Sequence, residues 1–166
     1  MGGRPFTLVG RQLKVGDRAP NFRLLTRDLK EVELSQTAGK VRLIASVHSL
    51  DTPICDLEAR RFNAEAASMP GMVVYVVSMD LPFAQARYCG AQNIQNLQTL
   101  SDHREASFGR AYGVLIKELR LLARALFIVD GAGLIRYVDY LPEVGQHPDY
   151  EKALQALRSL AGTAQA

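Results

Sequence analysis

The residues best suited to chemistry are a threonine and a cysteine at the start of a predicted helix. The sequence there reads Thr52-Pro53-Ile54-Cys55. Threonine is favoured as the residue that caps a helix, and proline is favoured at the first helical position. Cys55 then lies in the first turn, where unpaired N–H groups and the helix dipole favour negative charge. Because helix N-termini lower the pKa of a cysteine thiol from about 8.5 to about 3.5–7.5, the pattern favours a reactive thiolate.

The neighbours of Cys55 leave two interpretations open. Asp56 follows directly and opposes a thiolate by like-charge repulsion. A reactive cysteine would therefore need a nearby cation, and an arginine keeps its charge at any working pH. Alternatively, Cys55 is an inert thiol that fills an apolar gap beside Ile54 and Leu57. These residues alone do not decide between the two.

The second cysteine, Cys89, limits the kinds of site that are possible. The two cysteines are far apart in the sequence, so they do not form the CxxC motif of thioredoxin-like redox enzymes. The histidines, His48, His103 and His147, show no ligand spacing with them. The sequence therefore predicts no zinc site.

Three segments resemble the bacterial thiol peroxidases, which form the atypical two-cysteine branch of the peroxiredoxins. They are "SLDTPIC", "SMDLPFAQARYCGAQNIQNLQTLSDHREASFGRAYGV" and "LLARALFIVDGAGLIRYVDYLPEV". The first supplies the Thr-x-x-Cys part of the Pro-x-x-x-Thr-x-x-Cys loop of peroxiredoxins. The similarity covers essentially all of residues 6–160, and it implies an α/β, thioredoxin-like fold.

The resemblance implies a role for each of four residues. Cys55 resembles the peroxidatic cysteine, which attacks the O–O bond of a hydroperoxide and becomes a sulfenic acid. Thr52 would hold the peroxide oxygen, and Arg124 would lower the pKa of the thiol and polarise the peroxide. Cys89 resembles the resolving cysteine, which forms an intramolecular disulfide with Cys55. Since sulfur carries the electrons, no metal and no organic cofactor are implied.

One residue departs from the family motif. The proline that begins the motif corresponds here to His48. One interpretation is a substitution that the loop tolerates. The other is an imidazole near the thiolate that changes its pKa or its accessibility, because a protonated histidine favours a thiolate and a neutral one does little.

The two cysteines are predicted at opposite ends of consecutive helices. A disulfide requires Cα atoms about 4.4–6.8 Å apart, so we expect the first turn around Cys55, residues 84–92, or both to unwind when it forms. Pro82 and Gly90 frame the second helix. A permanent structural disulfide is the alternative, and a reducing compartment argues against it.

The function that the resemblance implies is reduction of hydrogen peroxide and of organic, alkyl or lipid, hydroperoxides, with thioredoxin as the reductant and a homodimeric assembly. A peroxide sensor that oxidises a partner protein through the same cysteine pair is the alternative. Organic substrates would need an apolar groove. Its candidate lining residues are Leu50, Leu81, Phe83 and Tyr88.

The elements that must position these residues follow from hydrophobic periodicity and turn signals. We expect a small β-hairpin over residues 6–16, strands over 41–48, 72–80 and 97–102, a strand–turn–strand unit over 124–141, and helices over 53–68, 81–90, 104–112 and 149–162. The order predicts a mixed sheet with helices on its faces. Residues 48–55 then lie at the carboxyl end of a central strand, where open α/β sheets place their active crevice.

Composition limits the remaining classes of function. A chain of 166 residues forms one domain, and we expect flexible termini at residues 1–5 and 162–166. The net charge of +3 is spread along the chain, which argues against nucleic-acid binding. No apolar run is long enough to insert into a membrane, and the N-terminus lacks the apolar core of a secretory signal. A cytoplasmic location is therefore expected.

Overall fold

A mixed β-sheet forms the centre of the computed structural model, which describes residues 1–164 and the side chains of residues 1–160. The strand order is β10-β9-β4-β5-β6-β2-β3, and β4, β5 and β6 are parallel while the other pairings are antiparallel. The bounds are β2 (Arg23–Leu25), β3 (Glu31–Glu33), β4 (Arg42–Ser46), β5 (Val73–Ser78), β6 (Gln98–Ser101), β9 (Ala125–Val129) and β10 (Ile135–Tyr140).

The register of β4 brings two distant parts of the chain together. Strand β4 is buried along its whole length, as its apolar run predicted. Its last residue, Ser46, pairs with Val77 of β5 on one side and with Ala125 of β9 on the other. Because β9 runs antiparallel to β4, Arg124 lies beside the chain that leaves β4. The sheet thus places an arginine next to the loop that leads to Cys55.

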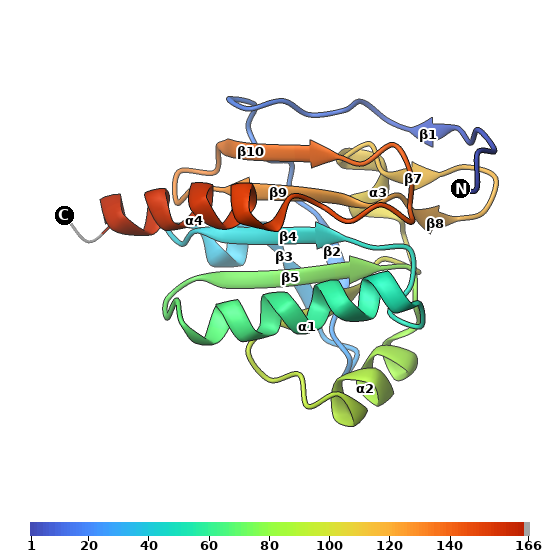
Figure 1. The fold of residues 1–166 in the computed structure, drawn as a ribbon, viewed down its shortest axis with the longest axis horizontal. Coiled ribbons are helices and arrows are strands. Elements are labelled where there is room, and N and C mark those ends of the chain that lie inside the picture. Colours follow the sequence, from blue (N-terminus) through green and yellow to red (C-terminus); the bar gives the residue numbers. More distant parts are fainter. Residues whose placement is uncertain (165–166) are drawn as a thin grey trace.

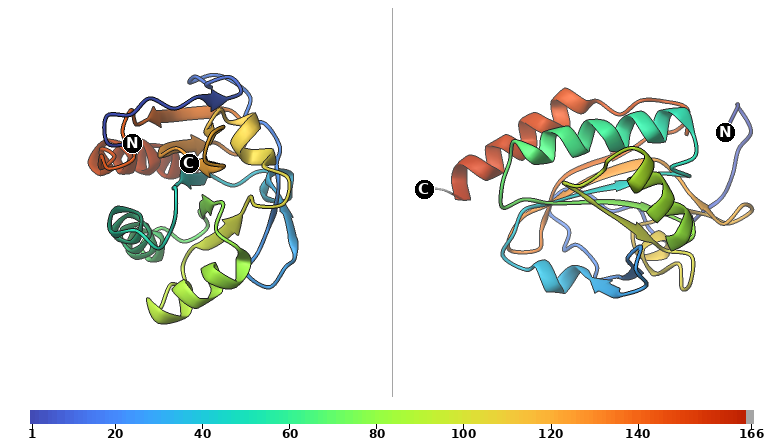
Figure 2. Two further views of the ribbon diagram at one scale, coloured as in Figure 1. Left: turned by 90° about the vertical axis from the view of Figure 1, so that its right-hand side faces the viewer. Right: turned by 90° about the horizontal axis from the view of Figure 1, so that it is seen from below.

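Two helices cover one face of the sheet. Helices α1 (Pro53–Ala67) and α4 (Tyr150–Ala164) lie side by side on this face (Figures 1 and 2). Helix α2 (Pro82–Ala91) packs against β6. The apolar cluster on this face includes Phe62 of α1 and Leu157 of α4, each fully buried. The amphipathic pattern of residues 149–162 therefore describes the packing face of α4 correctly.

The opposite face packs against α3 (Ser107–Ala111) and a small antiparallel sheet. That sheet has the order β1-β7-β8, with β1 (Leu8–Val9), β7 (Leu115–Ile116) and β8 (Leu121–Leu122). A small antiparallel extension at the N-terminus is confirmed, but β1 pairs with β7 and not with a second N-terminal strand. After β1 the backbone passes so close to the carbonyl of Arg110 that a Cβ on Gly10 would lie 2.1 Å from its oxygen. This contact carries the chain across the sheet, so no hairpin forms within residues 6–16.

Two helix boundaries differ from the predicted ones. Gly90 lies inside α2, which ends at Ala91, and Asn93 takes the left-handed conformation with φ of 54°. Asparagine tolerates this conformation better than most residues, so the helix ends without glycine. Helix α3 begins at Ser107, later than expected, because Ala106 is also left-handed, with φ of 53°.

The two ends of the chain differ in how they are held. The N-terminal ammonium of Met1 lies 3.4 Å from the carboxylate of Glu143. Helix α4 continues to Ala164, and of the expected flexible segment 162–166, residues 165–166 lie outside the described part of the chain. Within the described residues, no helix has the length and apolar character needed to cross a membrane.

Candidate active site

Cys55 lies in the first turn of α1, as predicted, and its side chain is fully buried. Thr52 is the N-cap residue in extended conformation, Pro53 opens the helix, and the Asp56 N–H donates to the Thr52 carbonyl at 2.9 Å. The Thr52 hydroxyl does not cap the helix. It donates instead to the carbonyl of Ser49 at 2.7 Å, which fixes the loop that precedes the cysteine.

Arg124 supplies the cation that the presence of Asp56 demanded. Its Nη2 donates to the sulfur of Cys55 at 3.1 Å, and its side chain is fully buried. The rest of the guanidinium is also held, because Nε donates to the Val144 carbonyl at 2.9 Å and Nη1 donates to Oε2 of Glu58. A planar group fixed on three sides cannot turn away, so one donor always points at the sulfur.

Asp56 is directed away from the thiol by two other partners. Its carboxylate lies 2.9 Å from Nη2 of Arg60, and it accepts a hydrogen bond from the Tyr88 hydroxyl at 2.8 Å. Because Arg60 neutralises this charge at the surface, repulsion of the Cys55 thiolate is weakened. The same tyrosine also joins α2 to the first turn of α1.

The environment lowers the pKa of Cys55 to about 6. Burial alone raises the pKa, since it penalises the charged form. Groups that bond to or attract the thiolate outweigh burial: the side chains of His48 and Thr52, the backbone of Ser49 and the charge of Arg124. The reactive interpretation of Cys55 is therefore the one that the geometry supports.

We predict that the Cys55 thiol ionises with a midpoint near pH 6. The ultraviolet absorbance of the thiolate should rise through this pH in the wild-type protein and not in the Cys55→Ser variant. Reaction rates that depend on the thiolate should fall below pH 6 and level off above pH 7, because the thiolate is then the main form. A single midpoint near the ordinary cysteine value of about 8.5 would contradict the assigned environment.

Asp80 organises the loop between β4 and α1. Its carboxylate accepts hydrogen bonds from the Ser49 hydroxyl at 2.7 Å, the Leu50 N–H at 2.8 Å and the Ser78 hydroxyl at 2.8 Å. Asp80 follows β5, so it ties the ends of two parallel strands to one loop. This connection holds the chain just before Thr52 and Cys55 in place.

We predict that Asp80→Asn loosens this loop. The amide keeps one acceptor oxygen and places an NH₂ group where a donor already points, so one buried bond is lost. The free energy of unfolding should fall by about 1–3 kcal/mol in urea titration, and oxidation of Cys55 should slow. Asp51→Asn is the matched control, because Asp51 is exposed on the same loop. If Asp80→Asn and Asp51→Asn had the same free energy of unfolding and the same rate of Cys55 oxidation, Asp80 would have no specific role in the site.

Cys89 lies near the end of α2, buried, and both cysteines are free thiols. Its sulfur lies 3.4 Å from Oγ1 of Thr99 on β6, whereas the sulfur of Cys55 contacts Arg124 and His48. The two thiols therefore have separate partners in this state.

The four candidate groove residues separate into two pairs. Leu50 and Tyr88 line a cavity of about 340 Å³ between the active-site loop and α2. Leu81 and Phe83 lie at the N-terminal end of α2, outside this lining, with 52% and 67% of their surface exposed. The structure therefore brings two of the four together beside the loop.

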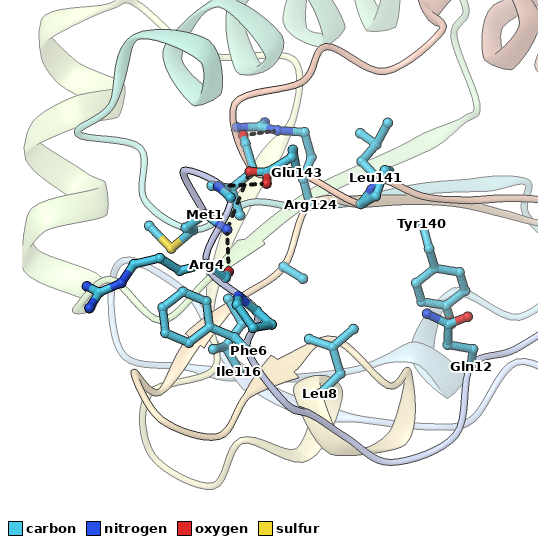
Figure 3. A pocket seen from close by; sticks show the side chains of 15 residues that line it. Met1, Arg4, Phe6, Leu8, Gln12, Ile116, Arg124, Tyr140, Leu141 and Glu143 are labelled. Atoms are coloured by element: carbon cyan, nitrogen blue, oxygen red, sulfur yellow. Dashed lines mark hydrogen bonds and ion pairs between the residues drawn. The ribbon is translucent and has the colours of Figure 1, made fainter.

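A second cavity, of about 430 Å³, has Arg124 in its lining (Figure 3). The N-terminal segment and the chain that follows β10 enclose it, and the ion pair between Met1 and Glu143 joins its walls. Phe6 and Leu141 contribute apolar surface.

Two residues of this site, Glu58 and Asp80, were not among those predicted from the sequence. Glu58 is fully buried and pairs with Arg124, and burial raises the pKa of its carboxyl. In the sequence it is one of several polar residues on a helix, and nothing marks it as buried. Asp80 carried a weak signal, because it is the last residue of the predicted strand over 72–80, and α/β sheets place functional residues at the carboxyl ends of strands.

Comparison with known proteins gives concordant matches. The Redoxin family model matches residues 14–154. Thiol peroxidases from Halalkalibacterium halodurans and Bacillus subtilis are 53% and 52% identical over 157 and 158 residues, covering 95% of this chain and of each relative. The crystal structure of a peroxiredoxin-like protein from Aquifex aeolicus matches with a TM-score of 0.90 at 45% identity, over 96% of this chain and 94% of that one. A thiol peroxidase from Chromobacterium violaceum gives 0.86 at 25%, over 99% and 96%. The thioredoxin-like fold implied by the sequence is confirmed.

Proposed function

Since this chain belongs to the thiol peroxidase family, within the redoxins, we propose that it reduces hydrogen peroxide and organic hydroperoxides at Cys55. The observation that carries the proposal is the hydrogen bond from Arg124 Nη2 to the buried sulfur. This hydrogen bond stabilises the Cys55 thiolate before a peroxide arrives. The positive charge of Arg124 then polarises the O–O bond of the peroxide. A fixed donor in a site that excludes water is an effective stabiliser of developing charge.

The catalytic cycle that we propose uses both cysteines. The Cys55 thiolate attacks the peroxide oxygen, which the Thr52 hydroxyl helps to hold, and a sulfenic acid and an alcohol or water result. Cys89 then attacks the sulfenic acid sulfur, and an intramolecular disulfide forms with loss of water. Thioredoxin returns both thiols to the reduced state by exchange.

Disulfide formation requires the contacts between α1 and α2 to change. Cys89 must leave Thr99, and the bond between the Tyr88 hydroxyl and Asp56 connects the two segments that have to move. Both contacts lie within one turn of a cysteine. Local unwinding of the first turn of α1, of residues 84–92, or of both therefore supplies the motion, at the ends of helices where fraying is least costly.

Three further features belong to the proposal. The cavity lined by Leu50 and Tyr88 supports organic hydroperoxides as substrates, because its walls include apolar side chains beside the reactive loop. A homodimer and a cytoplasmic location are proposed from the family. Reduced thioredoxin is the expected partner protein.

The decisive experiment uses reduced protein, one equivalent of hydroperoxide and a rapid quench with an alkylating reagent, followed by intact mass measurement. Loss of two hydrogens, with neither cysteine alkylated, would establish the cycle. Two alkylated thiols after long exposure would contradict it. Steady turnover with thioredoxin would then separate a peroxidase from a peroxide sensor, which oxidises a partner protein and turns over slowly with thioredoxin.

A further inference from the structure

His48 contacts the reacting sulfur directly. Its Nδ1 lies 3.4 Å from Cys55 Sγ and 3.5 Å from Nη2 of Arg124. Together with the bond from Nη2 to the sulfur, the three polar atoms form a closed triangle. A proline in this position, as in the family motif, has no polar side-chain atom to place there. The imidazole therefore adds a group that can carry a proton to the reacting centre.

We propose that His48 is a catalytic proton carrier, which takes the proton of the Cys55 thiol and gives it to the leaving oxygen of the hydroperoxide. This inference rests on the proposed peroxidase function and adds a residue to it. The ring is only partly buried, so its far side can exchange protons with solvent.

The proton and electron balance of the step is complete. The thiol proton moves to Nδ1, which leaves a thiolate beside an imidazolium. The sulfur then attacks the terminal oxygen of ROOH, so that an S–O bond forms and the O–O bond breaks. Sulfur loses two electrons and the peroxide gains them. The departing RO⁻ takes the proton from Nδ1, which yields ROH, the sulfenic acid Cys55–SOH and a neutral His48.

The other groups around the sulfur cannot take this role. Arg124 keeps its protons at any working pH, so it stabilises charge without transferring a proton. The Thr52 hydroxyl already donates to the Ser49 carbonyl and is a far weaker acid. Imidazole is the side chain that ordinarily gains and loses a proton near neutral pH.

The charges around the imidazole favour transfer in the required order. The Cys55 thiolate on α1 stabilises the imidazolium, while the guanidinium of Arg124 before β9 opposes it, with Glu58 bound behind the guanidinium. When the sulfur becomes a neutral sulfenic acid, the stabilising anion is lost and the opposing cation remains.

The test compares two oxidants that differ in their leaving groups. tert-Butyl hydroperoxide releases a strongly basic alkoxide that needs a proton, and peracetic acid releases acetate, which does not. Oxidation of Cys55 in a single turnover is measured by rapid quench and mass for the wild type and for His48→Gln near pH 6, and each rate is divided by the fraction of Cys55 that ultraviolet absorbance shows to be thiolate. We expect about a 100-fold loss for the variant with tert-butyl hydroperoxide, at the lower end for general acid catalysis. The rate with peracetic acid should be unchanged.

The ratio of the two rates separates proton transfer from other effects. A variant that only lost thiolate or loop order would react more slowly with both oxidants by the same factor, and this outcome would overturn the proposal. Unchanged rates with both oxidants would also overturn it. His147→Gln, an exposed histidine after β10, is the matched control and should leave both rates unaltered. A wild-type protein that neither oxidant converts would instead refute the peroxidase function itself.

Discussion

Replacing Cys55 by serine is expected to abolish hydroperoxide reduction while the protein remains folded. A serine hydroxyl does not ionise near neutral pH, so the nucleophile is lost and no S–O bond can form. The oxygen fits the buried site and can still accept the hydrogen bond from Arg124. Consumption of hydrogen peroxide in the presence of thioredoxin, its reductase and NADPH measures the effect. Circular dichroism checks the fold.

Cys89→Ser is the matched control for this experiment. Its first oxidation should proceed at the wild-type rate, because the Cys89 sulfur contacts Thr99 and is not among the groups that activate Cys55. The variant should consume one equivalent of peroxide and then stop as a sulfenic acid, which dimedone traps. Continued turnover by Cys55→Ser would refute the assignment of the nucleophile, and continued turnover by Cys89→Ser would refute the intramolecular disulfide.

Arg124→Ala should impair both chemistry and stability. The thiolate loses its donor, so the pKa of Cys55 should rise and the first oxidation should slow by about 100- to 1000-fold, as when a donor to a developing charge is removed. The change also leaves Glu58 fully buried without its partner. Breaking a buried ion pair in this way costs about 3–5 kcal/mol in the free energy of unfolding. Single-turnover oxidation and urea titration measure the two effects.

A second substitution separates the two effects of Arg124→Ala. Adding Glu58→Gln replaces the unpaired buried carboxyl with a neutral amide, so stability should largely return while oxidation stays slow. Arg60→Ala is the surface control, because its pairing with Asp56 is exposed and worth less than about 1 kcal/mol. If Arg124→Ala oxidised at the wild-type rate, another cation would have to activate Cys55.

The parts of the site that could be predicted from the sequence are those with local signals. Thr52 and Pro53 mark a helix start, and Cys55 follows within one turn, so its position needed no tertiary information. Arg124 and Cys89 came from the family resemblance, since nothing in their own neighbourhood marks them. Glu58 could not be found, because its burial depends on where α1 meets β9.

The same distinction applies to the fold. Long buried strands and amphipathic helices have strong periodic signals, and their predicted positions hold to within a few residues. Strands β7 and β8 have two residues each, too short for any period, and they pair across the turn at residues 117–120, where the Arg120 N–H donates to the Ile116 carbonyl. The partner of β1 could not be predicted either, because it is set by the close passage of Gly10 past Arg110.

Cys55 and Glu58 lie one turn apart on α1, but the helix must unwind at Cys55 in the proposed cycle and is held in place at Glu58. In the proposed cycle the sulfur moves towards Cys89, whereas Glu58 is held by an ion pair with both side chains fully buried. Unwinding that began at Thr52 would therefore meet a barrier after a single turn, and amide hydrogen exchange should be fast before Glu58 and slow beyond it. Oxidation would then shorten α1 by its first turn only. The rest of the helix would stay folded and would keep Arg124 in position, through Glu58, for the next peroxide.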